Sequence, residues 1–165
     1  MTLIATSSQT VGPFFHFGLT APGTANATPL PAGVARLTLT VSVHDGDDRP
    51  VDDAAVEIFY RAEAAPDAPC LFARLGTGDD GTCTFELARP AAQVNACVFA
   101  RGLLRHLHTR IYFEGDPALR TDPVLALVPE SRRGTLLARR EQGNGDRWRF
   151  DIRLQGADET VFFDL

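Results

Sequence analysis

The chain has 165 residues, 44% of them hydrophobic and 22% charged, values that are typical of a soluble globular protein. This length fits one domain with a substantial core, and we expect a single domain over residues 1–165. The net charge of −5 at pH 7 argues against a nucleic-acid-binding protein. No apolar run approaches membrane-spanning length, and the first ten residues lack the features of a signal peptide, so we expect a cytoplasmic protein.

The cysteines indicate the redox state. Cys70, Cys83 and Cys97 stand too far apart for a CxxC pair, and three thiols do not make an even disulfide framework. We therefore expect reduced thiols in the core of the protein.

Residues 1–35 predict an irregular N-terminal arm, because they are rich in Gly, Pro, Thr and Ala. Prolines at four positions argue against a long helix there: Pro13, Pro22, Pro29 and Pro31.

From Arg36 onward, apolar residues alternate with polar ones, which is the period of a half-buried strand. The first strand is predicted over residues 36–44, before a turn at Asp45-Gly46. Asp79-Asp80-Gly81 is a second strong turn signal, and residues 142–146 form a hairpin loop. Further strands are predicted around residues 55–60, 82–87, 94–100, 106–113, 135–140, 147–154 and 160–163.

One short helix is predicted. Asp122 suits the N-cap, Pro123 suits the first helical position, and Pro129 ends the stretch 124–128. Many short strands separated by turns favour an all-β fold, namely an antiparallel β-sandwich that carries the long arm and this helix.

The segment His106-Leu107-His108 suggests metal binding. Residues two apart on a strand share a face, so the two imidazoles can chelate one ion, although a solvated strand face carries histidines equally well. A catalytic metal site normally has about three protein ligands, and spacing marks no third. The other candidates are available only by default: His16, His44, Tyr60 and Tyr112.

Other catalytic patterns lack support. No GxSxG elbow is present, and Ser7 and Ser8 lie on the arm without a marked base. Gly76-Thr77-Gly78 lacks the rest of a phosphate loop, and the aspartates of residues 45–53 lack calcium-loop spacing. Both segments are interpreted as turns or solvated loops.

Arg101 stands between the end of a predicted strand and Gly102. A guanidinium there is charged at any working pH and suits recognition of a carboxylate. A structural ion pair would explain an isolated arginine equally well.

Several segments, in order along most of the chain, resemble one family. They are Ser8-Gln9-Thr10-Val11-Gly12-Pro13-Phe14-Phe15, Phe99-Ala100-Arg101-Gly102, His108-Thr109-Arg110-Ile111-Tyr112-Phe113, Phe150-Asp151-Ile152-Arg153-Leu154-Gln155-Gly156 and Glu159-Thr160-Val161-Phe162-Phe163-Asp164. Together they are similar to the alpha-type subunits of the intradiol ring-cleavage dioxygenases. In that family an alternating His-x-His holds ferric iron, and Gln93 and Asn95 stand at the matching positions here.

The resemblance implies a non-iron-binding subunit. A homologous beta chain would hold Fe(III) through two tyrosines and two histidines, within a larger hetero-oligomer. With O₂ it would cleave protocatechuate to 3-carboxy-cis,cis-muconate, a step of the beta-ketoadipate pathway of aromatic catabolism. Hard phenolate oxygens stabilise the ferric state, whereas amides such as those of Gln93 and Asn95 are poor ligands for it.

Site residues are carried over position by position. Thr10, Gly12 and Pro13 resemble the arm positions that wall the substrate pocket, and Arg101 resembles the arginine near the substrate carboxylate. The resemblance implies neither a metal ligand nor a catalytic residue on this chain alone. Compared with the family, segment 61–76 is short.

Two alternatives stay open. A transthyretin-like scaffold or binding subunit would share the turn-rich strands and have no direct substrate role. An independent metalloenzyme would use His106 and His108.

Overall fold

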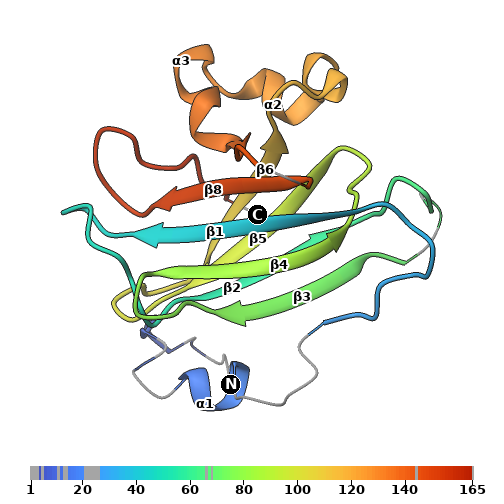
Figure 1. The fold of residues 1–165 in the computed structure, drawn as a ribbon. Coiled ribbons are helices and arrows are strands. Elements are labelled where there is room, and N and C mark those ends of the chain that lie inside the picture. The colour runs from blue at the N-terminus through green and yellow to red at the C-terminus, as the bar shows by residue number, and fades with distance from the viewer. Residues whose placement is uncertain are drawn as a thin grey trace.

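The computed structural model describes residues 4, 6–10, 12, 15–20, 27–65, 67, 69–143 and 145–164. Eight strands form one sheet that folds over itself into a sandwich (Figure 1), in the order β3-β2-β5-β6-β7-β8-β1-β4. The strands are β1 Arg36–His44, β2 Ala55–Tyr60, β3 Leu71–Gly76, β4 Thr82–Ala88, β5 Gln93–Phe99, β6 Leu107–Phe113, β7 Leu137–Arg140 and β8 Arg147–Arg153. The predicted β-sandwich is thus confirmed.

The sheet is mixed rather than wholly antiparallel, which corrects part of the prediction. β1 pairs in parallel with β8, and β6 pairs in parallel with β7 through Tyr112–Leu137 and Phe113–Ala138. β7 also pairs with β8, so it joins the layer β3-β2-β5-β6 to the layer β8-β1-β4. The connection from β6 to β7 runs through several short helices, and a crossover of this length can return the chain in the same direction.

The core lies between the two layers and follows the period of two. In β1 the alternate residues Leu37, Leu39, Val41 and Val43 are buried, as the sequence pattern predicts. The facing layer contributes residues of β2, β5 and β6, and rings from the two layers meet where Phe113 contacts Trp148 edge-on, with 5.1 Å between centroids. Burying each large apolar side chain stabilises the fold by about 1.5–3 kcal/mol.

The predicted helix is confirmed as α2, Pro123–Leu127, where the Asp122 carboxylate accepts hydrogen bonds from Val124 N and Leu125 N. The expectation of a single short helix was wrong. The others are α1 Phe15–Leu19, η1 Pro117–Arg120, α3 Glu130–Arg133 and η2 Gly134–Leu136. Each has five residues or fewer, too short to show a helical period. η1 repeats the Asp-Pro signal of α2, because the Asp116 carboxylate accepts from Ala118 N at 2.8 Å.

Two further strand assignments need correction. β3 was not predicted, because as an edge strand it has one buried residue followed by five of intermediate burial, with no alternation. The strand predicted at residues 160–163 is absent: Phe163 makes only an isolated bridge to His108, where its N–H donates to the His108 carbonyl at 2.8 Å. The other predicted strands are confirmed, with ends shifted by at most two residues.

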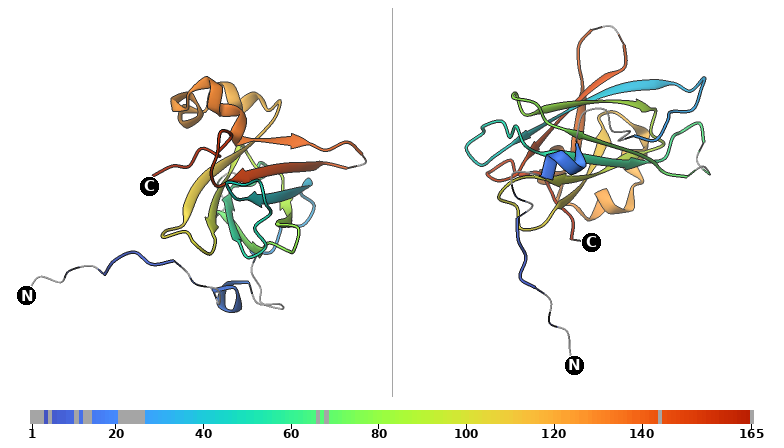
Figure 2. Two further views of the ribbon diagram at one scale, coloured as in Figure 1. Left: turned by 90° about the vertical axis from the view of Figure 1, so that its left-hand side faces the viewer. Right: turned by 90° about the horizontal axis from the view of Figure 1, so that it is seen from below.

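The ends of the sandwich differ. α2 and α3 lie at the upper end in Figure 1, whereas α1 lies below the lower end. The described arm residues 6–10 extend away from the sandwich in both views of Figure 2.

None of the helices in the described ranges has the length and apolar character needed to cross a bilayer. The extent of the domain, 1–165 with an arm over 1–35, stays a prediction.

Buried thiols are confirmed for two of the three cysteines. Cys83 and Cys97 are buried at 6% and 3% exposure, whereas Cys70 is exposed, so the prediction was wrong for that residue. Cys70 precedes the edge strand β3 and therefore does not face the core.

Candidate functional site

The turn between β5 and β6 brings two predicted site residues together. Gly102 follows Arg101 with φ +94°, a left-handed conformation that glycine adopts without strain. The Gly102 N–H donates to the Thr10 hydroxyl at 2.9 Å, across 92 positions of sequence. The N-terminal arm is therefore held against this turn at the residue beside Arg101.

The rest of the predicted pocket wall is only partly described. Gly12 also has a left-handed conformation, with φ +78°, and a Cβ built there meets nothing within 4 Å. Pro13 lies outside the described residues. The substrate-binding role of Thr10, Gly12, Pro13 and Arg101 stays a prediction.

Arg101 lies between two pockets of about 550 and 350 Å³ and lines both. Its Nε lies 3.0 Å from an Asp53 carboxylate oxygen, and the arginine side chain is 63% exposed. Asp45, Asp47 and Asp52 also line the larger pocket. On this chain alone the guanidinium is therefore partly neutralised, and the larger pocket carries more acidic than basic groups.

Gln93 and Asn95 share one face of β5, but they do not fit a ferric ion. The Asn95 amide donates to the Phe59 carbonyl at 3.3 Å. Both side chains are neutral amides. A hard ferric ion prefers anionic oxygen and imidazole donors, which this pair does not supply.

The two tyrosines have structural roles. The buried Tyr60 hydroxyl accepts from Ala88 N at 3.1 Å, and the Tyr112 hydroxyl donates to Asp122 at 2.9 Å. Burial raises the pKa of both phenols, which disfavours the phenolate form that a metal would bind. As default candidates for a metal ligand, they are thus poorly placed.

His106 and His108 acquire a third neighbour that spacing did not mark. Cys97 on β5 is the register partner of His108 on β6. One potential ligand atom from each of Cys97, His106 and His108 lies within 4.8 Å of the others. Antiparallel pairing across the Arg101-Gly102 turn is the signal that would have found Cys97. The side chain of His16, another default candidate, lies outside the described residues.

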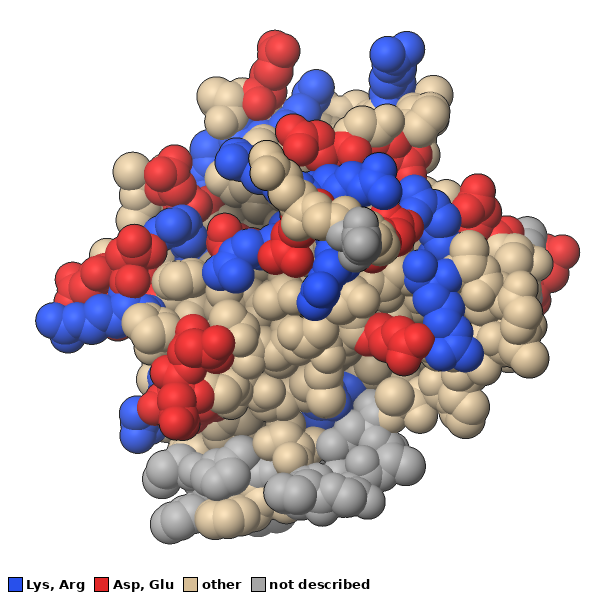
Figure 3. Space-filling view, viewed as in Figure 1, with Lys and Arg blue, Asp and Glu red and all other residues tan. Residues whose placement is uncertain are grey.

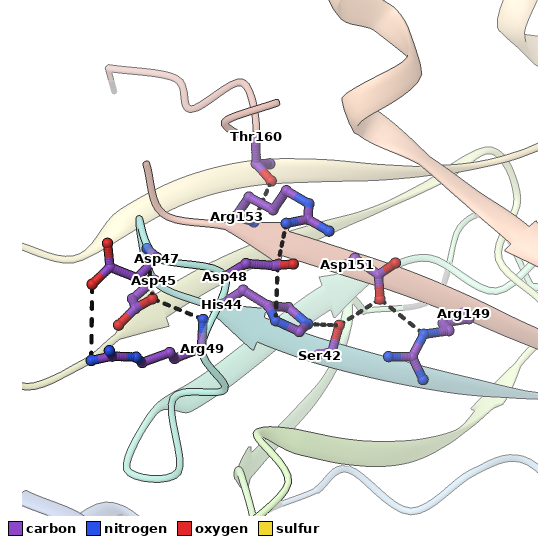
Figure 4. A network of polar contacts seen from close by, with 10 residues as sticks. All are labelled: Ser42, His44, Asp45, Asp47, Asp48, Arg49, Arg149, Asp151, Arg153 and Thr160. Atoms are coloured by element: carbon purple, nitrogen blue, oxygen red, sulfur yellow. Dashed lines mark hydrogen bonds and ion pairs between the residues drawn. The ribbon is translucent and has the colours of Figure 1, made fainter. Parts of the chain in front are cut away.

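A second polar group resembles a hydrolytic triad (Figure 4). His44 Nε2 lies 3.1 Å from Ser42 Oγ, and His44 Nδ1 lies 3.6 Å from an Asp48 oxygen. However, Ser42 is fully buried and donates its proton to Asp151 at 2.5 Å, so His44 must donate to the serine rather than take its proton. A nucleophile needs the opposite direction of proton transfer and access to a substrate.

The Ser42 network is structural. Burial alone would raise the pKa of Asp151, and the Ser42 hydroxyl together with Arg149 outweighs this effect, so the pKa lies below its ordinary value. Arg153 pairs with Asp48, which follows the turn after β1. These contacts hold β1 against β8 and fix the loop that borders the larger pocket.

On the face shown in Figure 3, positive and negative side chains are interspersed above a central uncharged area. No single-sign field marks this face as a docking site for a charged polymer.

No protein-family model matches the chain. Solved structures, however, share its fold. A dioxygenase domain from Streptomyces sp. SirexAA-E has a TM-score of 0.60 at 21% identity, covering 80% of this chain and 86% of that one. Catechol 1,2-dioxygenase from Pseudomonas arvilla C-1 has a TM-score of 0.56 at 21% identity, covering 78% and 55%. The fold is thus that of the intradiol dioxygenases.

Relatives found by sequence narrow the class from intradiol dioxygenases in general to one type of chain. Protocatechuate 3,4-dioxygenase alpha chains from Burkholderia cepacia and Pseudomonas putida are 38% and 34% identical, and each alignment covers at least 96% of both chains. The Burkholderia cepacia beta chain is 29% identical over 93% of this chain and 77% of its own length. The chain belongs to the protocatechuate 3,4-dioxygenase alpha-chain family, a branch of the intradiol dioxygenases, which are oxidoreductases.

The first alignment also bears on loop length. It spans 196 positions against 165 residues here, so the relative contains segments that this chain lacks. The shortening of segment 61–76 in particular stays a prediction.

Proposed function

We propose that this chain is the non-iron-binding subunit of a cytoplasmic protocatechuate 3,4-dioxygenase and completes the active site of a homologous beta chain. The beta chain would hold Fe(III) and open the ring of protocatechuate with O₂, giving 3-carboxy-cis,cis-muconate. This chain would contribute a wall and a positive charge to the pocket, within an alpha–beta hetero-oligomer.

The observation that carries the proposal is a contrast between strand β5 and the Arg101-Gly102 turn that follows it. Gln93 and Asn95 on β5 are neutral amides, and by resemblance they stand at the positions of the iron histidines. A few residues further on, the Arg101-Gly102 turn keeps a hydrogen bond to Thr10 of the arm. An amide pair next to a turn that binds the N-terminal arm fits a subunit that acts on a partner's metal centre.

The relatives support a two-chain assembly, because alpha and beta chains of the same enzyme both match this chain. An arm anchored at Thr10, whose described residues 6–10 extend from the sandwich (Figure 2), has the reach to contact a neighbouring subunit.

A second candidate function is a scaffold that stabilises the beta chain without touching the substrate. The Arg101–Asp53 pair favours it, since a paired guanidinium attracts a substrate carboxylate less strongly. Arg101 nevertheless has five N–H donors, so it can hold Asp53 and a second carboxylate together.

Co-expression with the beta chain tests the proposal. We expect iron, phenolate-to-iron colour and protocatechuate consumption in the co-purified complex, and none of the three in this chain purified alone. Iron and colour retained by the isolated chain would contradict the proposal that the beta chain, and not this chain, holds the iron.

Substitution of Arg101 separates the pocket role from the scaffold role. We expect Arg101→Ala in the complex to lower kcat/KM for protocatechuate about ten- to hundredfold, because a charge-assisted contact contributes about 1.5–3 kcal/mol. Catechol lacks the carboxylate, so any activity toward it should change little. Exposed Arg105, paired with Asp164, provides the matched control Arg105→Ala. Equal losses on both substrates, or no loss, would favour the scaffold.

A further inference from the structure

The group formed by Cys97, His106 and His108 is the strongest chemical feature that the proposed function does not use. Cys97 faces His108 across the β5–β6 ladder, and His106 precedes β6. The imidazole rings of His106 and His108 lie edge to face with 4.7 Å between centroids, and His106 also contacts the Phe99 ring. Two strands and one turn thus direct three donor atoms toward one point.

The distances suit a small ion. Tetrahedral coordination with Zn–S of about 2.3 Å and Zn–N of about 2.0–2.1 Å requires donor atoms roughly 3.4–3.6 Å apart. The three donor atoms lie within 4.8 Å of one another.

The three residues differ in how far they are exposed to solvent. Cys97 is 3% exposed, His108 is of intermediate burial and His106 is exposed. A buried donor is held in place by its strand, while the exposed donor leaves a path for an ion to enter from solvent.

We propose that Cys97, His106 and His108 bind a divalent transition-metal ion of the Zn²⁺ class, with a fourth coordination position left open. One thiolate and two imidazoles are donors that Zn²⁺ prefers, and three protein ligands with an open position form the pattern of a reactive rather than a closed structural zinc site. The site concerns this chain alone and does not depend on the proposed function.

One pair of opposite charges lies beside the group. Glu57 is the register partner of Cys97 on the other side, and it is held at 2.5 Å by Arg74. Metal binding requires neutral imidazoles and a thiolate, so the affinity of the site should rise with pH.

The thiol is a ligand rather than a free nucleophile. A metal binds the thiolate form of cysteine rather than the thiol. Coordination replaces its proton, so binding near neutral pH releases about one proton per ion.

Titration with Co²⁺ of the full chain, first treated with a chelator, tests the site. We expect a thiolate-to-cobalt charge-transfer band, visible absorption of tetrahedral intensity, saturation near one ion per chain and release of about one proton per ion in weak buffer. Absence of the charge-transfer band at excess Co²⁺ would overturn the proposal.

Variants assign the ligands. Cys97→Ser should abolish the charge-transfer band, and Cys70→Ser, which changes an exposed cysteine outside the group, should leave it intact. Because substitution of buried Cys97 can disturb folding, His106→Gln provides the second test at an exposed position. It should weaken Co²⁺ binding at least about tenfold, since even outer-shell changes cost about 10–100-fold. Unchanged affinity in folded His106→Gln, or loss of the band in Cys70→Ser, would contradict the assignment.

Discussion

Two polar groups in this protein look like catalytic machinery, and they differ in how far the fold satisfies them. The Ser42–His44 network lies at the β1–β8 ladder, where its buried serine both donates and accepts hydrogen bonds. The Cys97–His106–His108 group lies at the β5–β6 ladder, where a thiol and two imidazoles converge with one member exposed to solvent.

The difference shows why residue identity alone does not define a site. Serine, histidine and aspartate lie close together in the first group, yet every serine contact is used inside the protein. The second group lacks any familiar sequence motif, yet its three potential ligand atoms converge and His106 is exposed to solvent. Availability of the donor atoms, rather than the resemblance to a motif, separates the two.

The largest expected effect in this comparison is on folding stability. Ser42→Ala removes a hydrogen bond to the charged Asp151 and leaves His44 Nε2 without its acceptor, so we expect a loss of about 1.5–3 kcal/mol. Chemical denaturation measures this loss. Thr40→Val is the control on the same strand, because the Thr40 hydroxyl has only a 3.4 Å contact with Thr84. Equal small effects would remove the structural role assigned to Ser42.

A smaller effect is expected at Tyr60. Tyr60→Phe leaves the buried Ala88 N–H without the hydroxyl that accepts from it, which costs about 1–3 kcal/mol for an uncharged donor. The iron content of the alpha–beta complex should not change, because the phenol is a core group rather than a ligand. A drop in iron with unchanged stability would reverse this assignment.

The fall in folding stability at acidic pH, the acid limb of the stability curve, tests the structural role of Asp151. Its pKa is lowered in the folded protein from an ordinary value of 3.8, so its contribution is fully present above that value and is lost as the pH falls through the folded-state pKa. Asp151→Asn should therefore flatten the fall in unfolding free energy below about pH 5. An unchanged acid limb would show that Asp151 does not stabilise the fold in its charged form.

The smallest effect on folding stability is expected at His106, in the group formed by Cys97, His106 and His108. His106→Gln should change the free energy of unfolding by less than about 0.5 kcal/mol in metal-free protein, because the side chain is exposed. With bound metal the wild type should gain stability that the variant lacks. Thermal denaturation with and without Co²⁺ measures both quantities, and a large loss in the metal-free state would place His106 among the structural residues.

The candidate site was predictable in part. Its family motifs are contiguous in sequence, so Arg101 and the arm around Thr10 were both predicted, and the structure joins them through the hydrogen bond from Gly102 to Thr10. Cys97 was not predicted as a third ligand, because it faces His108 only through the register in which β5 pairs with β6. The pairing of Arg101 with Asp53 was also missed, because the two residues lie on separate loops of the fold.

The sequence alone determined the strands that have one buried face, the capped helix α2 and membership in a dioxygenase family, because alternation, caps and motifs are local. Only the tertiary structure decided the edge strand β3, the parallel pairs of β1 with β8 and β6 with β7, and the convergence of Cys97, His106 and His108. These features depend on which strands become neighbours and in which register. That choice follows from burial of the whole core, which no single segment encodes.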